Sequence, residues 1–344
     1  MSDKSKIYIF CPADTVTGGT ELLHQLADTL ISINKEAYVI YTKNNNIINQ
    51  VIPEPFKKYN IKTTVKPDFK DENIFIVPET AIYLLNNIPK GKKMIWWLSV
   101  DNFFLCKSCT AFSYFYFIYK NKLSALFHLC KQYIGDIIKK REHLLFQNVR
   151  LNKLEKTIIH LYQSEYARDF LKKRGFKKLF PLKDYINDDY IDNNNSYNKK
   201  NIVIYNPKKG FDFTKQLIAK NSSINWLPIQ NMNRQQVKDA MKSSKIYIDF
   251  GNHPGMDRMP REAALCGCCI ITGKNGSAKY FEDVPISNDY KFSQNKNTIN
   301  EIINKIIYIF SNYENVQHDF ELYRKFISVQ KTTFIQNVKE IFTN

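Results

Sequence analysis

Charged and hydrogen-bonding residues cluster between positions 247 and 267, where the sequence reads YIDFGNHPGMDRMPREAALCG. The apolar residues at its start predict a strand, and Pro260 suits the first turn of a following helix, where its missing N–H costs nothing. Glu262 then falls in that first turn, and Gly267 ends the helix as its C-cap. Because free N–H groups and the helix dipole favour an anion, the block predicts a phosphate site.

The side chains of this block suit a ligand that combines phosphate with hydroxyl groups. Arg258 and Arg261 add positive charge for a phosphate, and Glu262 can accept hydrogen bonds from ribose hydroxyls. His253 and Asp257 lie in the loop before the helix, which is also expected to face the ligand. A surface helix whose charged first turn is simply solvated is the alternative interpretation.

Two short segments in the same half of the chain also follow predicted strands. Residues 205–210 read YNPKKG, and residues 273–278 read GKNGSA. Lysine ammonium groups and exposed amides in such loops can meet a diphosphate or a sugar, although each segment alone is also typical of an ordinary turn. The donor-binding candidates from these segments are Asn206, Lys208, Lys209, Gly276 and Ser277.

A glycine pair near the N-terminus forms another candidate donor-binding element. Gly18 and Gly19 lie in the predicted loop 12–20, between a strand and a helix, where glycine allows the backbone to approach a ligand closely. The segment does not follow the pattern G-x-G-x-x-G, which argues against a nicotinamide or flavin site. A bare strand-to-helix turn is the alternative.

Strands and helices are predicted to alternate in both halves of the chain. The first half has predicted strands at 6–11, 37–41, 73–77, 93–98 and 157–163, with helices at 21–33 and 165–174. The second half has predicted strands at 202–205, 225–227, 246–250 and 268–272, helices at 213–219, 233–243 and 260–266, and a helical region at 298–342. Because this order is typical of parallel βαβ units, the expected fold class is α/β with two Rossmann-like domains.

The region 102–150 interrupts this alternation. It is rich in Phe, Tyr and Leu, carries interleaved lysines, and ends near the basic run Lys139, Lys140 and Arg141. Two helices are predicted here. They fit either an ordinary helix pair in the core or an amphipathic, basic and aromatic surface that contacts an anionic membrane or an acceptor lipid.

The composition is that of a globular chain long enough for two domains. The chain has 344 residues, of which 44% are hydrophobic and 24% charged. No segment reaches the roughly 18 consecutive apolar residues of a membrane-spanning helix. The N-terminal residues show no signal-peptide pattern, so we expect a cytoplasmic protein, with the inner face of the cytoplasmic membrane as a further expectation.

The net charge and the cysteine pattern leave several classes of binding partner open. A net charge of +17 attracts nucleic acid, anionic membrane surfaces and phosphorylated substrates alike. The seven cysteines form no regular framework, and the pair Cys106 and Cys109 lacks a second ligand pair for zinc. No metal site is therefore expected.

These segments stand in the order found in glycosyltransferases of the B-type fold. They resemble most the large retaining group that includes glycogen and sucrose synthases and bacterial cell-surface polysaccharide transferases. The N-terminal glycine pair resembles that group's glycine loop, residues 160–175 resemble its crossover segment, and PREAALCGCCIIT resembles the helix and strand that follow its paired-glutamate motif.

The resemblance implies a domain organisation. Two Rossmann-like domains are expected to face each other across a cleft. The first is an acceptor domain over 1–175 with a helical insertion near 102–150, and the second is a nucleotide-sugar domain over 176–320. A C-terminal helix over 321–344 is expected to cross back to the first domain, and the polar, Asn-rich stretch 188–200 is expected to be the linker.

Two positions depart from the family pattern. The family motif has two glutamates separated by seven residues, and Glu262 matches the second, which binds the ribose, whereas the first falls on Pro254. The PKKG segment resembles the loop whose basic residue contacts the donor diphosphate, which assigns that role to Lys209. The arginine that the family has before this residue is absent, and Asn206 stands in that region.

These departures change what the remaining residues are expected to do. Arg258 is expected to complete the phosphate clamp, and His253 or Asp257 to supply the polar group near the sugar. The identity of the donor and the choice between retention and inversion stay open. An inverting enzyme needs a base, for which Asp101 is the main candidate beside Asp14 and Glu79.

The resemblance implies transfer of a sugar from a nucleotide-diphosphate donor to a hydroxyl of a growing surface glycan, such as lipopolysaccharide, O-antigen or capsule. The nucleotide-sugar is a co-substrate, and no cofactor or metal is expected. Two other classes stay open. A nucleic-acid or other polyanion binder fits the net charge but not the scattered basic residues, and a sugar-nucleotide epimerase would share the architecture.

Overall fold

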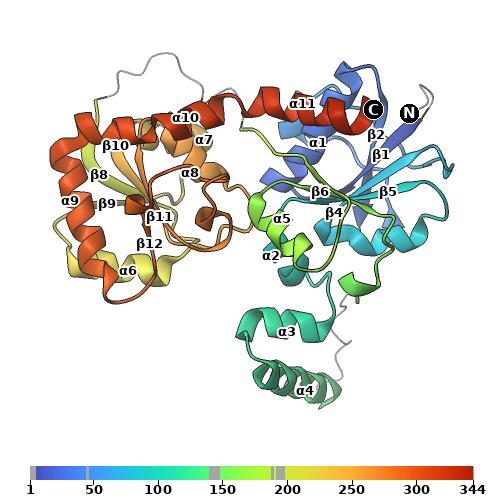
Figure 1. Ribbon diagram of the computed structural model, residues 1–344, viewed down its shortest axis with the longest axis horizontal. Helices are drawn as coiled ribbons and strands as arrows, with labels where there is room; N and C mark the ends of the chain where they lie inside the picture. The colour runs from blue at the N-terminus through green and yellow to red at the C-terminus, as the bar shows by residue number, and fades with distance from the viewer. Residues whose placement is uncertain (1–4, 44–45, 139–147, 187–189, 191–197, 344) are drawn as a thin grey trace. The chain divides into compact units, whose positions relative to one another are not determined.

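The computed structural model describes residues 5–43, 46–138, 148–186, 190 and 198–343. The chain divides into two compact units, which are described separately. The first comprises Met1–Gln163, Ala167–Leu182 and Ile335–Asn344, and the second Ser164–Tyr166 and Lys183–Phe334. Each unit is built on one largely parallel sheet with helices, which confirms the α/β class with two Rossmann-like domains (Figure 1).

The sheet of the first unit has the strand order β3-β2-β1-β4-β5-β6-β7, and only the pair β2 and β3 is antiparallel. The chain runs outward from β1 to β2 and then returns to the other side of β1 as β4. Loops diverge at such a reversal and leave room for a ligand. The strands are β1 (Lys6–Pro12), β2 (Glu36–Lys43), β3 (Asn46–Ile47), β4 (Ile74–Pro78), β5 (Lys92–Trp97), β6 (Ile159–Tyr162) and β7 (Leu179–Pro181).

Helix α1 (Gly18–Ser32) begins three residues before the predicted start. The hydroxyl of Thr17 accepts from the N–H of Thr20, and the Thr20 hydroxyl accepts from the N–H of Thr17, which makes a capping box. Gly18 and Gly19 therefore lie in the first helical turn and not in the loop expected for them. The other helices up to β7 are η1 (Glu54–Phe56), η2 (Glu79–Asn87), α2 (Val100–Leu105), α3 (Ala111–Tyr119), α4 (Lys122–Ile138), η3 (Leu151–Lys153) and α5 (Glu165–Lys172).

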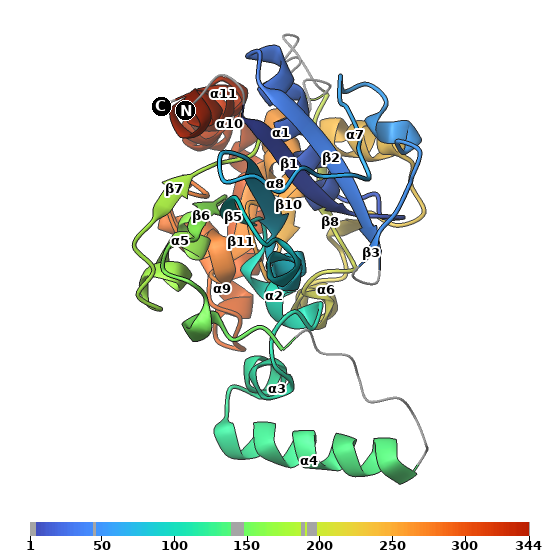
Figure 2. The ribbon, with the colours of Figure 1, turned by 90° about the vertical axis from the view of Figure 1, so that its right-hand side faces the viewer.

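The region that was predicted to hold two helices contains α2, α3 and α4. Helices α3 and α4 stand out from the sheet of the first unit, with α4 on the far side of α3 (Figures 1 and 2). Only Phe115 of α3 and Ala125 of α4 are buried, so these two helices are not a core pair. No helix in the described part of the chain is long and apolar enough to cross a membrane. The basic run at 139–141 lies outside the described residues.

The sheet of the second unit has the strand order β12-β11-β10-β8-β9, and all its neighbours are parallel. The chain passes from β8 to β9 on one side and then to β10 on the other side of β8, so the order reverses between β8 and β10. The central strands are almost wholly buried, because helices cover a parallel sheet on both faces. The strands are β8 (Lys200–Tyr205), β9 (Asn225–Pro228), β10 (Ser244–Asp249), β11 (Cys269–Gly273) and β12 (Lys291–Phe292).

The helices of the second half begin largely where the sequence predicts. Asn233 caps α7 and forms a capping box with Gln236, as its position before the apolar spacing suggested. The C-terminal helix predicted over 321–344 is instead two helices, since α10 ends before Val329. The helices are α6 (Phe211–Lys220), α7 (Arg234–Ser243), α8 (Arg258–Leu265), η5 (Gly276–Lys279), η6 (Asn288–Tyr290), α9 (Thr298–Val316), η7 (Gln317–Phe320), α10 (Glu321–Ser328) and α11 (Gln330–Thr343).

The units change along the chain at Leu182 and Lys183, a few residues after the predicted boundary at 175. Residues 321–334 group with the second unit, and residues from Ile335 onward group with the first. Most of the predicted linker, 188–189 and 191–197, lies outside the described residues. Its described end is fixed within the second unit, because the Lys199 ammonium donates to three backbone carbonyl groups there.

Candidate functional site

Three loops lie side by side at the carboxyl edge of the second sheet, because β8, β10 and β11 are parallel neighbours. The β8 loop, 206–210, leads into α6, the β10 loop, 250–257, leads into α8, and the β11 loop leads into η5. This edge includes the reversal of strand order at which doubly wound folds bind ligands. The predicted residues in these loops and the helix starts after them are Asn206, Lys208, Lys209, His253, Asp257, Arg258, Gly276 and Ser277.

Two glycines allow the three loops to touch. Gly210 has a φ of +61°, and a Cβ there would lie 2.2 Å from the backbone carbon of Phe250. Gly276 has a φ of +55°, and its Cβ would lie 2.0 Å from the carbonyl oxygen of His253. Neither position accepts a side chain without backbone movement. The β10 loop is therefore packed directly against both neighbouring loops.

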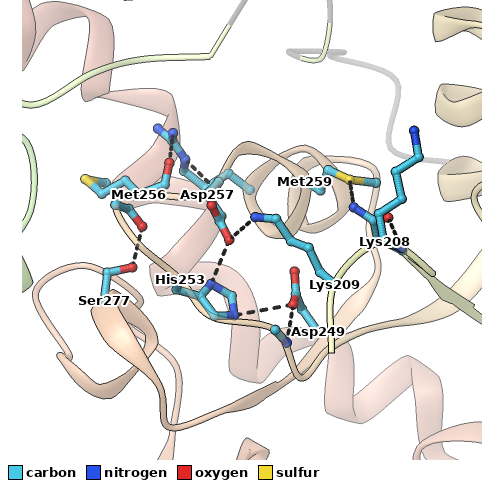
Figure 3. A network of polar contacts seen from close by, with 12 residues as sticks. Lys208, Lys209, Asp249, His253, Met256, Asp257, Met259 and Ser277 are labelled. Atoms are coloured by element: carbon cyan, nitrogen blue, oxygen red, sulfur yellow. Dashed lines mark hydrogen bonds and ion pairs between the residues drawn. The ribbon is translucent and has the colours of Figure 1, made fainter. Parts of the chain in front are cut away.

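A chain of polar side chains connects the β8 and β10 loops. The Nζ of Lys209 donates to Oδ2 of Asp257 at 2.7 Å. That oxygen is 3.3 Å from Nδ1 of His253, whose Nε2 is 3.6 Å from Oδ1 of Asp249. Figure 3 shows the imidazole between the two carboxylates, with Lys209 reaching Asp257 from the neighbouring loop. The Lys209 side chain is 36% exposed and that of Asp257 13%, so Lys209 offers the most surface to a ligand.

His253 is enclosed by these groups. Its side chain is 1% exposed, and neither ring nitrogen makes a hydrogen bond among the described residues. A sugar cannot reach the ring without displacing the atoms around it. The expectation that His253 contacts the reacting sugar is therefore corrected: the ring bears on the site through Asp257.

Asp249 is a member of the network that the sequence did not single out. Its carboxylate accepts from the Tyr247 hydroxyl at 3.1 Å and from the N–H of Gly251 at 2.9 Å. Burial, together with the nearby carboxylate of Asp249, raises the pKa of Tyr247 well above its ordinary value, so the phenol stays a donor. The signal was the spacing D-x-x-x-H-x-x-x-D from Asp249 to Asp257, which places three polar residues around one loop.

Asp249, His253 and Asp257 also have the geometry of a ligand set, because one ligand atom from each lies within 4.8 Å of the others. Carboxylate and imidazole groups can together hold a divalent cation. The Lys209 ammonium already bonds to Asp257 Oδ2, which a cation at that oxygen would have to share. The chain thus supplies a positive charge of its own at this point.

Helix α8 begins at Arg258, two residues before the predicted start. Pro260 stays in its first turn, but Glu262 falls in the second turn, which corrects the expected position of that carboxylate. The end of the helix is confirmed. Gly267, at φ +83°, donates its N–H to Ala264, and the next N–H bonds to Ala263, as in a Schellman motif.

Arg261 does not point to a ligand. It is 1% exposed, and its Nη2 donates to Oδ2 of Asp184 at 2.7 Å, in a buried ion pair. Its Nη1 donates to Gln330 at 2.8 Å, and its Nε donates to the carbonyl of Asp257 at 3.1 Å. The predicted donor-binding role of Arg261 is therefore wrong, because all three of its nitrogens are bound within the second unit.

The hydroxyl and the N–H of Ser277 also donate hydrogen bonds within these loops. Its hydroxyl donates to the carbonyl of Gly255 at 2.6 Å, and its N–H donates to the carbonyl of His253 at 2.8 Å. The side chain is fully buried. The expectation that Ser277 binds the donor is corrected, since both of its donors fix the β10 loop, and its neighbour Gly276 provides the space for that contact.

The β8 loop holds its lysines by a local turn. The Asn206 side-chain oxygen accepts the N–H of Lys208 at 2.9 Å, and its amide nitrogen lies 3.3 Å from the Met259 sulfur. Lys208 is exposed, and Arg258, at the start of α8, is half-buried. Lys208, Lys209 and Arg258 are therefore the cationic residues of the prediction that keep exposed surface at this edge.

The remaining predicted residues belong to the first unit. Gly18 and Gly19 start the helix after β1, and Glu79 follows β4, so all three lie where the order of the first sheet reverses. Asp101 is buried in the first turn of α2. Glu79 is also buried, and its Oε2 accepts the N–H of Leu98 at 2.9 Å. Burial raises the pKa of Glu79 to about 7.

A pocket of about 400 Å³ lies in the second unit, around β12. The three loops after β8, β10 and β11 are called here the loop cluster. The pocket touches this cluster only through Lys274 of the β11 loop, and none of the predicted site residues lines it. Its lining residues are Lys274, Asn288, Asp289, Lys291, Phe292, Ser293, Thr298, Glu301 and Lys305.

No protein-family model and no curated protein sequence matches the chain. Solved structures do match it over nearly its whole length. Sucrose-phosphate synthase from Thermosynechococcus elongatus has a TM-score of 0.63 at 8% identity, covering 99% of this chain and 98% of that chain. HepE from Anabaena, in complex with UDP and glucose, has a TM-score of 0.61 at 10% identity, covering 98% and 99%.

A glycosyltransferase from Rickettsia africae has a TM-score of 0.58 at 14% identity, and 99% of each chain is covered. At such identities the likeness concerns the backbone. It agrees with the two largely parallel sheets and with the strand reversals described above. The chain therefore has the two-Rossmann-domain fold of the B-type glycosyltransferases.

Proposed function

We propose that this protein is a glycosyltransferase that moves a sugar from a nucleotide-diphosphate donor to a hydroxyl group. The observation that carries the proposal is the half-exposed Lys209 ammonium, which Asp257 fixes beside the start of α8 at the strand reversal of the second sheet. A fixed cation next to a helix N-terminus suits a diphosphate. The fold is that of glycosyltransferases, one of which is described in complex with UDP and glucose.

The proposed chemistry depends on charge that develops during the reaction. Breaking the bond between sugar and phosphate leaves negative charge on the diphosphate. Lys209, Arg258 and the free N–H groups of α8 would stabilise that charge more in the transition state than before it. Lys208 and the Asn206 turn would complete the phosphate side, and Glu262 would accept from the ribose hydroxyls. Because these cations belong to the chain, the proposed transfer needs no metal.

Asp257 and His253 take positioning roles in this proposal. Asp257 holds the ammonium of Lys209, so the lysine need not lose orientational freedom when the donor binds. His253 lies against the same carboxylate and fixes it from the buried side. Should the enzyme invert, Asp101 of the first unit is proposed as the base, and Gly18 and Gly19 at the start of α1 as further donor contacts.

The proposed acceptor is a growing surface glycan, lipopolysaccharide, O-antigen or capsule, linked to a lipid. The proposed location is the cytoplasm, at the inner face of the membrane. The supporting feature is the hairpin of α3 and α4, which projects from the sheet of the first unit. Its exposed side chains are aromatic, aliphatic and basic.

The deciding experiment is isothermal titration calorimetry with a panel of UDP-, GDP-, CMP- and ADP-sugars. One donor should bind the wild-type chain, and Lys209→Ala should weaken that binding at least tenfold, because a charge-assisted hydrogen bond to phosphate is lost. Glu262→Ala should weaken it for donors that carry a ribose. The matched control is Lys215→Ala, which removes the same charge from the exposed surface of α6.

Two results would overturn the proposal. One is the absence of binding to every nucleotide-sugar in the panel. The other is equal donor affinity in Lys209→Ala, Glu262→Ala and the Lys215→Ala control. Salt-dependent DNA binding together with the first result would favour the polyanion-binding alternative that the net charge of +17 allows.

A further inference from the structure

Helix α4 turns its apolar side outward. Ala125 is its only buried residue, whereas Leu123 and Ile138, near its two ends, are 79% and 74% exposed. Phe127, in the first half of the helix, is 64% exposed. The exposed apolar positions include Leu123, Leu126, Phe127, Ile134, Ile137 and Ile138, called here the apolar arc.

The apolar arc is one continuous face of the helix. At about 100° per residue, its six positions fall within roughly 120° of the helix circumference, and the exposed Cys130 lies near the middle. The opposite face packs on α3, where the His128 ring stacks on Tyr119 with the centroids 3.9 Å apart. That inner face mixes the apolar Ala125 and Leu129 with the polar Gln132 and Asp136. The exposed face of the helix is therefore more apolar than the face against the protein.

Among the described residues, no side chain covers this apolar face, which points to an occupant beyond them. Burying apolar surface is worth about 25 cal/mol per Å². Scattered apolar residues are common on protein surfaces, but a contiguous apolar face over a 17-residue helix is typical of an interaction site. Helix α3 adds Phe112, Tyr116 and Ile118 to the exposed apolar surface of the hairpin.

The charges around the arc favour an anionic lipid surface. Lys122 and Lys131 lie just outside its two edges at the same spacing of about 100° per residue, and Lys120 ends α3 beside it. Asp136 is the one carboxylate of the two helices, and it lies on the side of α3. A second copy docked arc to arc would bring lysines together with no carboxylate to pair them. Lysines that flank an apolar face instead match a bilayer with anionic headgroups.

We propose that α4 lies in the headgroup region of an anionic bilayer, with the apolar arc inserted and Lys122 and Lys131 at the phosphates. At about 1.5 Å per residue the helix offers a face about 25 Å long, which suits a helix that lies in the plane of the membrane. The exposed tyrosines Tyr116, Tyr119 and Tyr133 suit the same interface, because their rings are apolar and their hydroxyls polar. This proposal concerns the first unit and stands apart from donor binding.

The test is co-flotation of the full chain with vesicles of phosphatidylcholine containing about a third phosphatidylglycerol, compared with vesicles of phosphatidylcholine alone. The wild type should bind the anionic vesicles preferentially. The double change Phe127→Asn and Ile134→Asn should lower the partition coefficient at least tenfold. Its matched control is Ile307→Asn with Leu322→Asn, two exposed apolar residues of the second unit, which should leave binding unchanged. Lys122→Ala and Lys131→Ala should each weaken binding about fivefold at low salt.

A fluorescent label locates the contact. An environment-sensitive dye on Cys130, in a Cys106→Ser background, should shift to the blue when anionic vesicles are added, since Cys130 is exposed within the arc. The same dye on Cys106, in a Cys130→Ser background, should shift less. Vesicle binding that survives the Phe127 and Ile134 changes would overturn the proposal, as would dimerisation through the arc without vesicle binding.

Donor calorimetry on the same variants keeps the two proposals separate. The arc variants should keep the wild-type melting temperature and the wild-type donor affinity, because the changed side chains are exposed and lie outside the loop cluster. Lost vesicle binding with intact donor binding would support the membrane proposal. Intact vesicle binding in a chain that binds no donor would support it as well, while it would count against the proposed sugar transfer.

Discussion

The loop cluster of the second unit and the α3–α4 hairpin of the first break the ordinary pattern of burial in opposite directions. In the loop cluster, His253, Asp249 and the neighbouring Arg261 are almost completely buried although they are polar or charged. In the hairpin, Leu123 and Ile138 are mostly exposed although they are aliphatic. Charged residues usually lie outside and large aliphatic residues inside, so both regions need a specific physical reason.

The two regions differ in where the partners of these side chains lie. The buried groups of the loop cluster have their partners inside the second unit, as in the Arg261 and Asp184 pair at 2.7 Å. They fix geometry, and they let Lys209 keep exposed surface at a defined place. The apolar arc has no such inner partner among the described residues, and the lipid surface proposed above would supply one. Inverted burial thus marks a framework in one region and a docking surface in the other.

The largest expected effect comes from adding one methyl group to a glycine of the loop cluster, compared with the same change in the hairpin. Gly210→Ala places a Cβ 2.2 Å from the backbone carbon of Phe250 at a φ of +61°, so the β8 and β10 loops must move apart. We expect a loss of at least about 4 kcal/mol in the free energy of unfolding and a loss of donor binding. Thermal unfolding and calorimetry would measure both.

Gly135→Ala is the matched change in the hairpin. Among the described residues, a Cβ at this position on α4 would meet nothing within 4 Å beyond its own helical turn. Alanine also favours a helix over glycine by up to about 1 kcal/mol. The variant should be at least as stable as the wild type. If the two alanine variants melted alike, the loop cluster would not be the tightly packed framework described here.

The second prediction tests whether the buried ion pair of Arg261 and Asp184 stabilises the fold. Arg261→Met leaves the buried Asp184 carboxylate without its partner, so we expect a loss of about 3–4 kcal/mol in the free energy of unfolding. The double change Arg261→Met and Asp184→Leu should recover part of that loss. Lys209→Ala should lower donor affinity and leave the melting temperature nearly unchanged. A stable Arg261→Met protein with weakened donor binding would restore the donor-binding role first expected for Arg261.

The sequence predicts the framework well where local chemistry decides the outcome. Gly267 ends α8 because only a residue that tolerates positive φ fits there, and Asn233 starts α7 because its side chain caps the free N–H groups. The alternation of apolar strands and amphipathic helices likewise indicates the α/β class. These features depend on a few neighbouring residues and can be recognised without the fold.

The sequence predicts less where a distant residue decides. Arg261 and Arg258 look equivalent beside Pro260, and the difference arises from Asp184, 77 positions away, which takes the Arg261 guanidinium. Periodicity shows that α4 is amphipathic, but it does not tell which side packs on α3. His253 looked accessible because its burial depends on the β8 and β11 loops, which meet it only in the folded unit.

The third prediction extends the comparison to a buried carboxyl in the first unit. Burial raises the pKa of Glu79 from an ordinary 4.5 to about 7, against the N–H groups of Leu98 and Ser99, which lower it. The folded chain then holds this proton more tightly than the unfolded chain. The stability that the proton contributes is present below pH 4.5 and is lost as the pH rises through about 7.

Glu79→Gln removes that titration. Relative to this variant, the free energy of unfolding of the wild type should fall by up to roughly 3 kcal/mol between pH 4.5 and pH 7. Urea unfolding at several pH values would measure the difference, with Glu155→Gln as the control, because Glu155 is an exposed carboxyl in a long surface pair with Lys93. Parallel pH profiles for wild type and Glu79→Gln would show that folding does not raise the pKa of this carboxyl.

The smallest expected effect concerns His253, which links the buried and the exposed parts of the loop cluster. His253→Gln keeps a polar side chain but removes the ring that lies 3.3 Å from Asp257 and 3.6 Å from Asp249. Asp257 then holds Lys209 less firmly, so donor affinity should fall about threefold to fivefold, which corresponds to roughly 1 kcal/mol. His318→Gln, at an exposed pair with Glu321, should leave the affinity unchanged.

A metal titration decides between the two roles open to the three residues around His253. If Asp249, His253 and Asp257 form a cation site, Zn²⁺ or Mn²⁺ should raise the melting temperature of the wild type but not that of His253→Gln. If they position Lys209, neither ion should stabilise either protein, and the loss of donor affinity should appear in His253→Gln and disappear when Lys209 is already alanine. That dependence on Lys209 is what a merely structural histidine would not show, because its effect would be the same whether the ammonium is present or absent.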